Sequence, residues 1–176
     1  MPPRMDATPS RKEQIIDAAV TLFASQGYYK TTTAHVAGAV GVTQPYVFHF
    51  FKSKEQLFIA VLERAVSRLQ EAFRAVDAPK ELILDTMGQQ FNRLIESHRD
   101  EMLVTMQSFT TSEPAIRDAV RTQFSHIYEI VKDRLERAGV NNSAANASMF
   151  IGSGMMVTLS EVLDLPELLP KSKKPL

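Results

Sequence analysis

The sequence contains no cysteine, which excludes disulfide bonds, thiolate metal sites and a cysteine nucleophile. It also lacks a long apolar run. The least polar stretch, residues 144–159, is interrupted by Asn146, Ser148, Ser153 and two glycines, so it is too short and too polar to cross a bilayer. The first ten residues lack the basic and then apolar build of a signal peptide. We therefore expect a protein without a membrane segment, located in the cytoplasm.

Net charge and enzyme motifs are missing as well. The chain has 20 basic and 20 acidic residues, and the first 56 residues carry six basic against four acidic ones, which alone does not indicate nucleic-acid binding. No nucleophile elbow, phosphate-binding loop, metalloprotease motif or dinucleotide-binding glycine set is present. Four scattered histidines and no cysteine argue against a zinc site. We predict no catalytic residue, no metal and no cofactor.

What the sequence does contain is helical periodicity throughout, which predicts an all-α fold. Ser10 with Glu13, and Ser53 with Gln56, have the spacing of capping boxes that begin a first and a fourth helix. Thr32 or Thr33 is expected to cap a second helix and Thr43 a third. Further helices are expected over residues 82–95, 102–109, 114–139 and 143–163.

Residues 36–50 have the pattern of two short helices joined by a tight turn. Ala37 is small enough for the helices to cross closely, and Gly41 can adopt the positive φ that the turn requires. Val47 then anchors the second helix against the first. This spacing predicts a helix-turn-helix, although a helical hairpin in an ordinary bundle would have similar features.

The exposed face of the second of these helices favours DNA binding. A recognition helix enters the major groove by its N-terminal end, where Gln can bond adenine and Tyr or Pro can pack on a thymine methyl. Hydroxyl, imidazole and ammonium groups suit phosphate contacts, and Lys54 stands at a helix N-terminus, which favours an anion. The predicted DNA contacts are Thr33, Thr43, Gln44, Pro45, Tyr46, His49 and Lys54.

Several short motifs together resemble the tetracycline-repressor (TetR) family over residues 11–62. They are Gly27-Tyr28, Thr31-Thr32, Val36-Ala37, Gly41-Val42-Thr43, residues 48–51, Ser53-Lys54-Glu55 and Leu57. The resemblance implies a three-helix DNA-binding head, a fourth helix linking it to a helical body, and a ligand-responsive dimer. Pro45 stands where the family usually has Gly, and Phe48 where it usually has Tyr, which puts a backbone donor and a phosphate-reaching hydroxyl in doubt.

The last two long helices resemble the pair that joins the subunits of this family. Glycines inside a helix cost about 1 kcal/mol each relative to Ala, so those in the last helix indicate close packing against a neighbour. The alternative is packing within one subunit. The predicted homodimer contacts are Phe124, Ala147, Phe150, Ile151, Gly154 and Met155.

The middle helices are rich in Met and Phe, residues that adapt to irregular apolar shapes and equally well fill a plain core. From the resemblance we expect some of them to line a cavity for a small apolar effector. The predicted ligand contacts are Met87, Phe91, Met102, Met106, Phe109 and Tyr128.

The sequence thus predicts three parts: an arm and helix-turn-helix domain (1–55), a ligand-sensing and dimerisation domain (56–170) and a flexible tail (171–176). The function expected is that of a transcriptional regulator, a repressor that binds a palindromic double-stranded DNA operator as a homodimer and is released by the effector. The alternatives are a helical interaction module, or an enzyme of unknown reaction that does not bind DNA.

Overall fold

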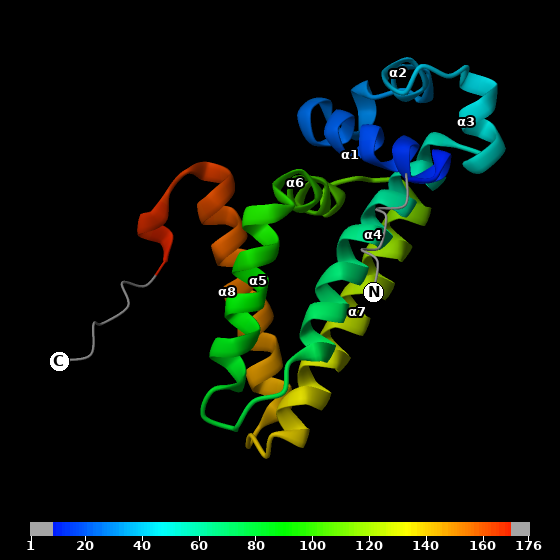
Figure 1. Cartoon of the computed structure of the whole chain (residues 1–176). Coiled ribbons are helices and arrows are strands. Elements are labelled where there is room, and N and C mark those ends of the chain that lie inside the picture. Colours follow the sequence, from blue (N-terminus) through cyan, green and yellow to red (C-terminus); the bar gives the residue numbers. More distant parts are fainter. Residues whose placement is uncertain (1–8, 170–176) are drawn as a thin grey trace, which may run out of the picture.

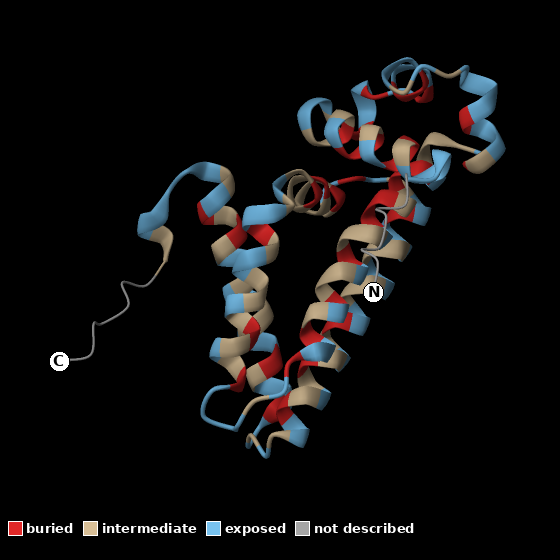
Figure 2. Ribbon diagram, in the orientation of Figure 1, coloured by how far each residue is buried: buried red, intermediate tan, exposed pale blue. Residues whose placement is uncertain are grey.

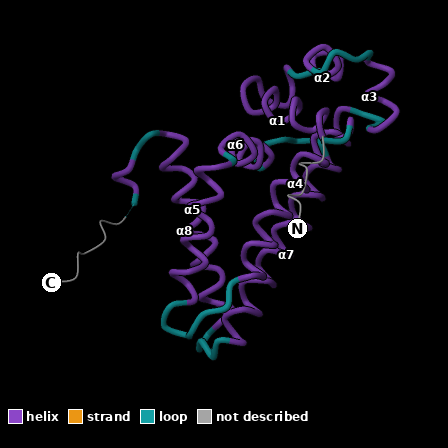
Figure 3. The backbone as a smooth tube through the Cα atoms, viewed as in Figure 1, coloured by secondary structure: helices purple, strands orange, loops and turns teal. Residues whose placement is uncertain are grey.

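The computed structural model describes residues 9–169, which form eight α-helices and one short 3-10 helix and contain no β-strand (Figure 3). The elements are α1 (Arg11–Lys30), α2 (Thr33–Ala39), α3 (Gln44–Phe50), α4 (Lys54–Ala75), α5 (Ile83–Ser97), α6 (Arg99–Ser108), α7 (Pro114–Arg137), α8 (Ser143–Leu163) and η1 (Pro166–Leu168). The all-α prediction is confirmed. The tail predicted over residues 171–176 lies outside the described residues.

The predicted helix starts follow from local capping. The Ser10 hydroxyl accepts from the Glu13 amide, and the Glu13 carboxylate accepts from the Ser10 amide, so the first capping box is complete. The second is only half right: Ser53 caps α4, but the Gln56 side chain accepts from the Lys52 amide at 3.3 Å.

Two further positions settle where the short helices begin. Thr32 caps α2 through its hydroxyl, which accepts from the His35 amide at 3.2 Å. Thr43 occupies the residue before α3, as predicted, but its side chain makes no capping bond there.

The helices form a small head and a larger body (Figure 1). In the head, α1, α2 and α3 pack together at one end of the molecule. In the body, α4 runs alongside α7, α5 runs alongside α8, and α6 crosses beneath the head against α1. Helix α4 belongs to both parts, because its N-terminal turns pack on α1 and its remaining length packs on α7.

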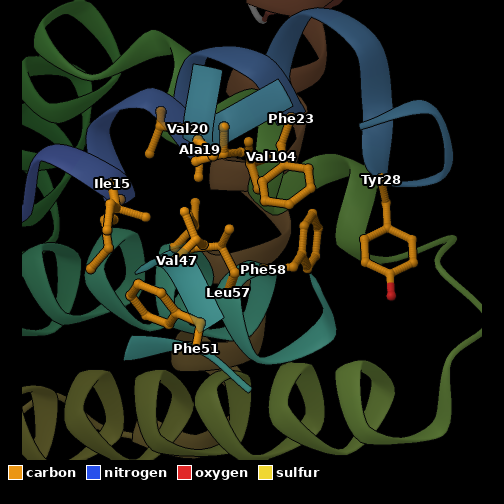
Figure 4. Packing of buried hydrophobic residues seen from close by; sticks show 14 of the residues in the cluster. Ile15, Ala19, Val20, Phe23, Tyr28, Val47, Phe51, Leu57, Phe58 and Val104 are labelled. Carbon is orange, nitrogen blue, oxygen red and sulfur yellow. The ribbon is translucent and has the colours of Figure 1, made fainter. Parts of the chain in front are cut away.

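The head has its own apolar core (Figure 4). Ile15, Phe23, Val47, Leu57 and Phe58 are buried together, and the Phe23 and Phe58 rings meet edge to face at 4.9 Å. Residues from the body complete this core, namely Val104 of α6 and Ile116 of α7. The head is therefore seated on α4, α6 and α7, and a movement of these helices acts directly on its packing.

A second apolar cluster fills the body, between α4, α5, α7 and α8. Its buried members include Leu62 and Phe73 of α4, Met87 of α5, and Val131 and Leu135 of α7. Burial follows one stripe along each of α4 and α7, while their other faces are exposed (Figure 2). The head and the body thus meet along α4, with no linker between them.

Candidate nucleic-acid interface and ligand cavity

The turn between α2 and α3 has the geometry expected of a helix-turn-helix. Gly41 has a φ of 68°, which glycine adopts without strain, and the Val42 amide donates to the Ala37 carbonyl at 3.0 Å. Ala37 and Val47 are buried where the two helices meet. The expectation that these three residues fix the motif is confirmed.

With Val47 buried, the rest of α3 is turned outward (Figure 2). Thr43, Gln44, Pro45, Tyr46 and His49 are all exposed, at the N-terminal end and along the outer side of this helix. The rings of Tyr46 and His49 both pack edge to face on Phe50, with centroids 5.4 and 5.2 Å away. The predicted base-reading residues therefore share one accessible surface, which we call the α3 face.

Two predicted phosphate contacts lie elsewhere. Thr33 is buried, and its hydroxyl accepts from the Gln44 side-chain amide at 2.8 Å. This bond ties the start of α2 to the start of α3 and orients Gln44. A buried hydroxyl cannot reach a phosphate, so the prediction for Thr33 is wrong in this conformation, and its place in the site is to position Gln44.

Lys54 is likewise turned inward. Its ammonium donates to the carbonyl oxygens of Tyr28, at 2.9 Å, and Tyr29, at 3.4 Å, and lies 4.3 Å from the centre of the Tyr28 ring. The positive φ of Gly27 ends the regular part of α1 and brings these carbonyls to the start of α4. Lys54 thus ties the end of α1 to the start of α4, which corrects the expectation of an ammonium free to meet a phosphate.

Tyr28 forms the other side of this contact. Burial, reinforced by the carboxylates of Glu113 and Glu55, raises the pKa of Tyr28 to about 12. Its neighbour Tyr29 is exposed, and its hydroxyl lies 2.8 Å from the Ser112 hydroxyl and donates to Glu113 at 3.0 Å. The end of α1 is therefore fixed both to α4 and to the start of α7. The sequence showed the Gly27-Tyr28 motif but not these partners.

The body contains a partly open cavity of about 260 Å³, lined by residues of α4, α5, α6, α7 and α8 and of the segments that join them. Four of the six predicted ligand residues lie on its wall: Phe91, Met102, Met106 and Phe109. Met87 is fully buried in the body core and Tyr128 is half-buried beside it, and neither lines the cavity. The expectation that these two residues reach a ligand in the cavity is therefore corrected.

Most residues predicted as dimer contacts face into the same subunit. Phe124, Phe150, Ile151, Gly154 and Met155 line the cavity, and Ala147 is fully buried. A Cβ atom at Gly154 would lie 3.4 Å from Cε1 of Phe91, so this glycine gives room to a ring of its own chain. Of the two glycines in α8, Gly152 has open space around it instead.

The outward face of α8 carries other residues. Ser148, Met149, Gly152 and Met156 are exposed along one side of the helix, and Met149 has 71% of its surface accessible. Large apolar side chains so exposed indicate a contact surface. Of the predicted dimer contacts, Met155 is also exposed, at 45%, while Phe124, Phe150, Ile151 and Gly154 are half-buried and Ala147 is buried.

One end of the cavity is charged. Glu101 of α6 has a side chain only 7% exposed, and its Oε1 accepts from Arg64 Nε at 3.0 Å and from Nη1 of Arg68, both on α4. Arg64 also donates to Asp17 of α1 at 2.6 Å. This cluster, Asp17–Arg64–Glu101–Arg68, connects the cavity wall to the first helix of the head, and no sequence pattern predicts it because its members are far apart in the chain.

Within residues 9–169, no helix combines the length and the apolar character needed to span a membrane. The same residues contain no group of three or more His, Cys, Asp or Glu side chains that could hold a metal ion.

Comparison with known proteins gives a family match over the head. Residues 15–61 match the model described as bacterial regulatory proteins, tetR family. In sequence, the chain is similar to the HTH-type transcriptional regulator BetI of Rhizobium meliloti (strain 1021), with 31% identity over 85 residues, or 46% of this chain and 42% of that protein. The chain spans about half the length of the relatives it matches in sequence.

Solved structures show that the fold extends over the body as well. The fatty acid degradation regulator FadR from Bacillus halodurans superposes with a TM-score of 0.77, at 19% identity, over 88% of this chain and 89% of that one. The transcriptional regulator FadR from Bacillus subtilis, solved in complex with stearoyl-CoA, superposes with a TM-score of 0.74, at 22% identity and the same coverage. The order of head and helical body is therefore that of these regulators.

Proposed function

The chain belongs to the tetR family of bacterial regulatory proteins, and we propose that it is a transcriptional regulator that binds double-stranded DNA and responds to a small ligand. The observation that carries the proposal is the α3 face. Burial of Val47 holds this helix against α2 and leaves its first turn accessible, the arrangement that lets a recognition helix enter the major groove.

On this proposal, the residues of the α3 face divide by chemistry. Gln44 and Tyr46 read bases, Gln44 by its amide and Tyr46 by packing on a thymine methyl, while Thr43 and His49 contact phosphates. Pro45 packs against the bases without a backbone donor. Thr33 and Lys54 support the face from within the head, through Gln44 and through Tyr28.

We propose further that two copies pair through the outward faces of α7 and α8, centred on Met149, Gly152 and Met156. A twofold dimer presents two α3 faces to the two halves of a palindromic site, and one head alone reads only a half-site. As in the repressors among its relatives, binding of the dimer to its operator would block transcription.

The ligand we propose is mostly apolar and occupies the cavity of about 260 Å³ between α4 and α8. The phenylalanine rings and methionine thioethers on its wall suit a hydrocarbon chain or an aromatic compound. Several of the similar proteins are named as regulators of fatty acid metabolism or degradation, and one was solved with stearoyl-CoA, which favours an acyl compound here.

Release from DNA would follow from the position of α4. Val66, Leu69 and Phe73 line the cavity, while Leu57 and Phe58 of the same helix lie in the head core. A ligand that favours another position of α4 changes the distance between the two α3 faces of the dimer. Linkage then requires that DNA and ligand weaken each other's binding by the same factor.

The test is binding to DNA itself. Fragments of the source genome are mixed with the full chain, the retained ones are sequenced, and their affinity is measured at several salt concentrations. We expect a recurring palindromic sequence and an affinity that falls linearly with salt on logarithmic axes. An enzyme or a helical interaction module would retain no specific fragment, and that result would reject the proposed function.

A further inference from the structure

The cavity has an uneven chemical lining. Of the residues on its wall within the described part of the chain, Arg68 and Glu101 carry the formal charges, and they lie together where α4 faces α6. Most of the remaining wall is apolar, with Phe91, Met106 and Phe109 among its large side chains. A ligand that fills this space meets hydrocarbon along most of its length and a charged pair at one end.

The two charged residues differ in how far their hydrogen-bonding capacity is used. Glu101 is nearly buried and accepts two guanidinium bonds on one oxygen, which compensates its desolvation. A guanidinium has five N–H donors, and Arg68 gives one of them to Glu101. The Arg68 side chain is also 36% exposed, so its other donors can still meet a partner. The unused capacity at this end of the cavity therefore consists of the remaining donors of Arg68 and the second carboxylate oxygen of Glu101, and Arg68 is the more accessible of the two side chains.

The charges on the cavity wall are balanced, because Arg68 and Glu101 carry one of each sign and Arg64 is not among the lining residues. The side chain of Arg68 is 36% exposed and that of Glu101 only 7%, so a polar group entering here meets the guanidinium first. An acidic group would complete the bonds of Arg68.

We propose that Arg68 is the recognition residue for the acidic group of an amphipathic ligand, whose hydrocarbon chain fills the Phe- and Met-lined cavity. The simplest such group is a carboxylate, which accepts paired bonds from a guanidinium fork. This assignment rests on the proposed ligand-responsive function, and it adds the class of ligand and the residue that selects it. Glu101 is then the internal competitor, since ligand and Glu101 bind the same guanidinium.

Competition gives the proposal a signature that structural damage does not. Removing the Arg68 charge must weaken binding of an acid, whereas removing the Glu101 charge must strengthen it, because Arg68 is then released from its internal partner. A variant that merely loosened the cavity would weaken binding in both cases. Glu101→Gln preserves the side-chain volume, and Arg68→Gln shortens the side chain but keeps a neutral hydrogen-bonding group.

The experiment uses the full chain without DNA and three probes with the same ten-carbon chain: decanoate, decanol and decylammonium. Calorimetric titration is expected to give the tightest binding for decanoate. Arg68→Gln should weaken decanoate about tenfold or more, as for loss of a charged hydrogen bond, and leave decanol within about twofold. Glu101→Gln should strengthen decanoate, and Arg68→Lys, which keeps the charge but loses the fork, should fall between wild type and Arg68→Gln.

Three results would overturn the assignment: decylammonium binding more tightly than decanoate, Arg68→Gln binding decanoate as well as the wild type, or none of the probes binding. Far-UV circular dichroism checks that each variant is folded. If Arg68→Gln does not fold, Arg68→Lys takes its place in the comparison. Since no DNA is present, these results are independent of the operator experiment. A chain that binds no DNA could still select decanoate through Arg68, and a chain that binds its operator could fail to select decanoate.

Discussion

Replacing Arg64 by methionine should lower the free energy of unfolding by about 2–3 kcal/mol. Methionine keeps most of the apolar stem and removes the charge. Two bonds are lost. The one to Asp17 is short, at 2.6 Å, but Asp17 is 60% exposed, so this bond contributes about 0–1 kcal/mol. The bond to Glu101 involves a carboxylate only 7% exposed, and a charged hydrogen bond there contributes about 1.5–3 kcal/mol.

The remaining Arg68 sets the upper limit of this effect. Breaking a buried ion pair outright costs about 3–5 kcal/mol because a charge is left unpaired. Glu101 keeps its bond from Arg68, so the loss at Arg64 stays below that range.

Urea unfolding followed by far-UV circular dichroism, at one fixed protein concentration, measures the difference. Two controls isolate its origin. Asp17→Asn removes only the exposed half of the cluster and should cost less than about 1 kcal/mol. Arg121→Met removes a pair with Asp118 of similar length, 2.8 Å, whose side chains are 71% and 68% exposed, and should cost less than about 0.5 kcal/mol.

Salt gives a second check on the same variants. Raising the salt concentration to about 0.5 M screens exposed charges strongly and buried ones much less. The cost of Asp17→Asn should therefore shrink, while most of the cost of Arg64→Met remains. If Arg64→Met and Arg121→Met cost the same amount, burial of Glu101 does not decide the energy of this cluster and the reasoning fails.

Four further predictions follow from the site. Lys54→Met should lower the midpoint of thermal unfolding and leave the salt slope of DNA binding unchanged, since the Lys54 ammonium donates to backbone carbonyls. A salt slope smaller by about one unit would instead show that Lys54 contacts a phosphate. Tyr46→Ala should cost roughly 1–3 kcal/mol at particular base pairs of the selected operator, and a uniform loss over all sequences would contradict base reading. Met149→Asp should give monomers in sedimentation velocity, and an unchanged dimer would place the interface elsewhere. Because the pKa of Tyr28 is raised from 10.0 to about 12, the folded state keeps this proton at higher pH than the unfolded chain. Its stabilising effect is therefore complete below pH 10.0 and is lost as the pH rises to about 12. Tyr28→Phe should show a smaller fall in the urea midpoint over this window, and equal falls would refute the assignment.

The head was predictable because its signals are local. The Ser10–Glu13 capping box, the positive φ of Gly41 and the burial of Val47 each depend on residues a few positions apart. The capping box, the glycine turn and the buried valine all favour the same arrangement of short helices. Such agreement between local signals is what makes a sequence specify one structure. The exposed character of the α3 face then follows from the burial of Val47.

Lys54 and Thr33 were misassigned because their partners are distant in the sequence or belong to the backbone. Thr33 is bonded to Gln44, and Lys54 to two carbonyls more than twenty residues earlier. Residue type indicates that a lysine or a threonine can bind phosphate. It does not indicate which backbone groups a turn such as that at Gly27 leaves without partners nearby.

The packing of α8 was not predictable for a different reason. This helix has small and apolar residues on all sides, so its pattern does not distinguish the side that packs inward from the side that contacts a partner. Only the three-dimensional structure shows that Gly154 gives room to Phe91 while Gly152 lies open. Met87 of α5 was likewise predicted to line the cavity because its residue type does not distinguish a cavity wall from a filled core, where it lies.

The ion-pair cluster explains how the two sites can be coupled within a single helix. Arg64 and Arg68 are four residues apart on α4, so they lie on one side of it, a turn apart, and both bond the same oxygen of Glu101. Arg68 faces the cavity and Arg64 is bonded to Asp17 in the head. A ligand acid that draws Arg68 away removes one of the two charges that compensate Glu101. Arg64 must then carry more of that compensation, in competition with its bond to Asp17. The group that recognises the ligand and the contact that holds α1 are therefore separated by a single buried carboxylate, and α4 transmits the change without any flexible segment between cavity and head.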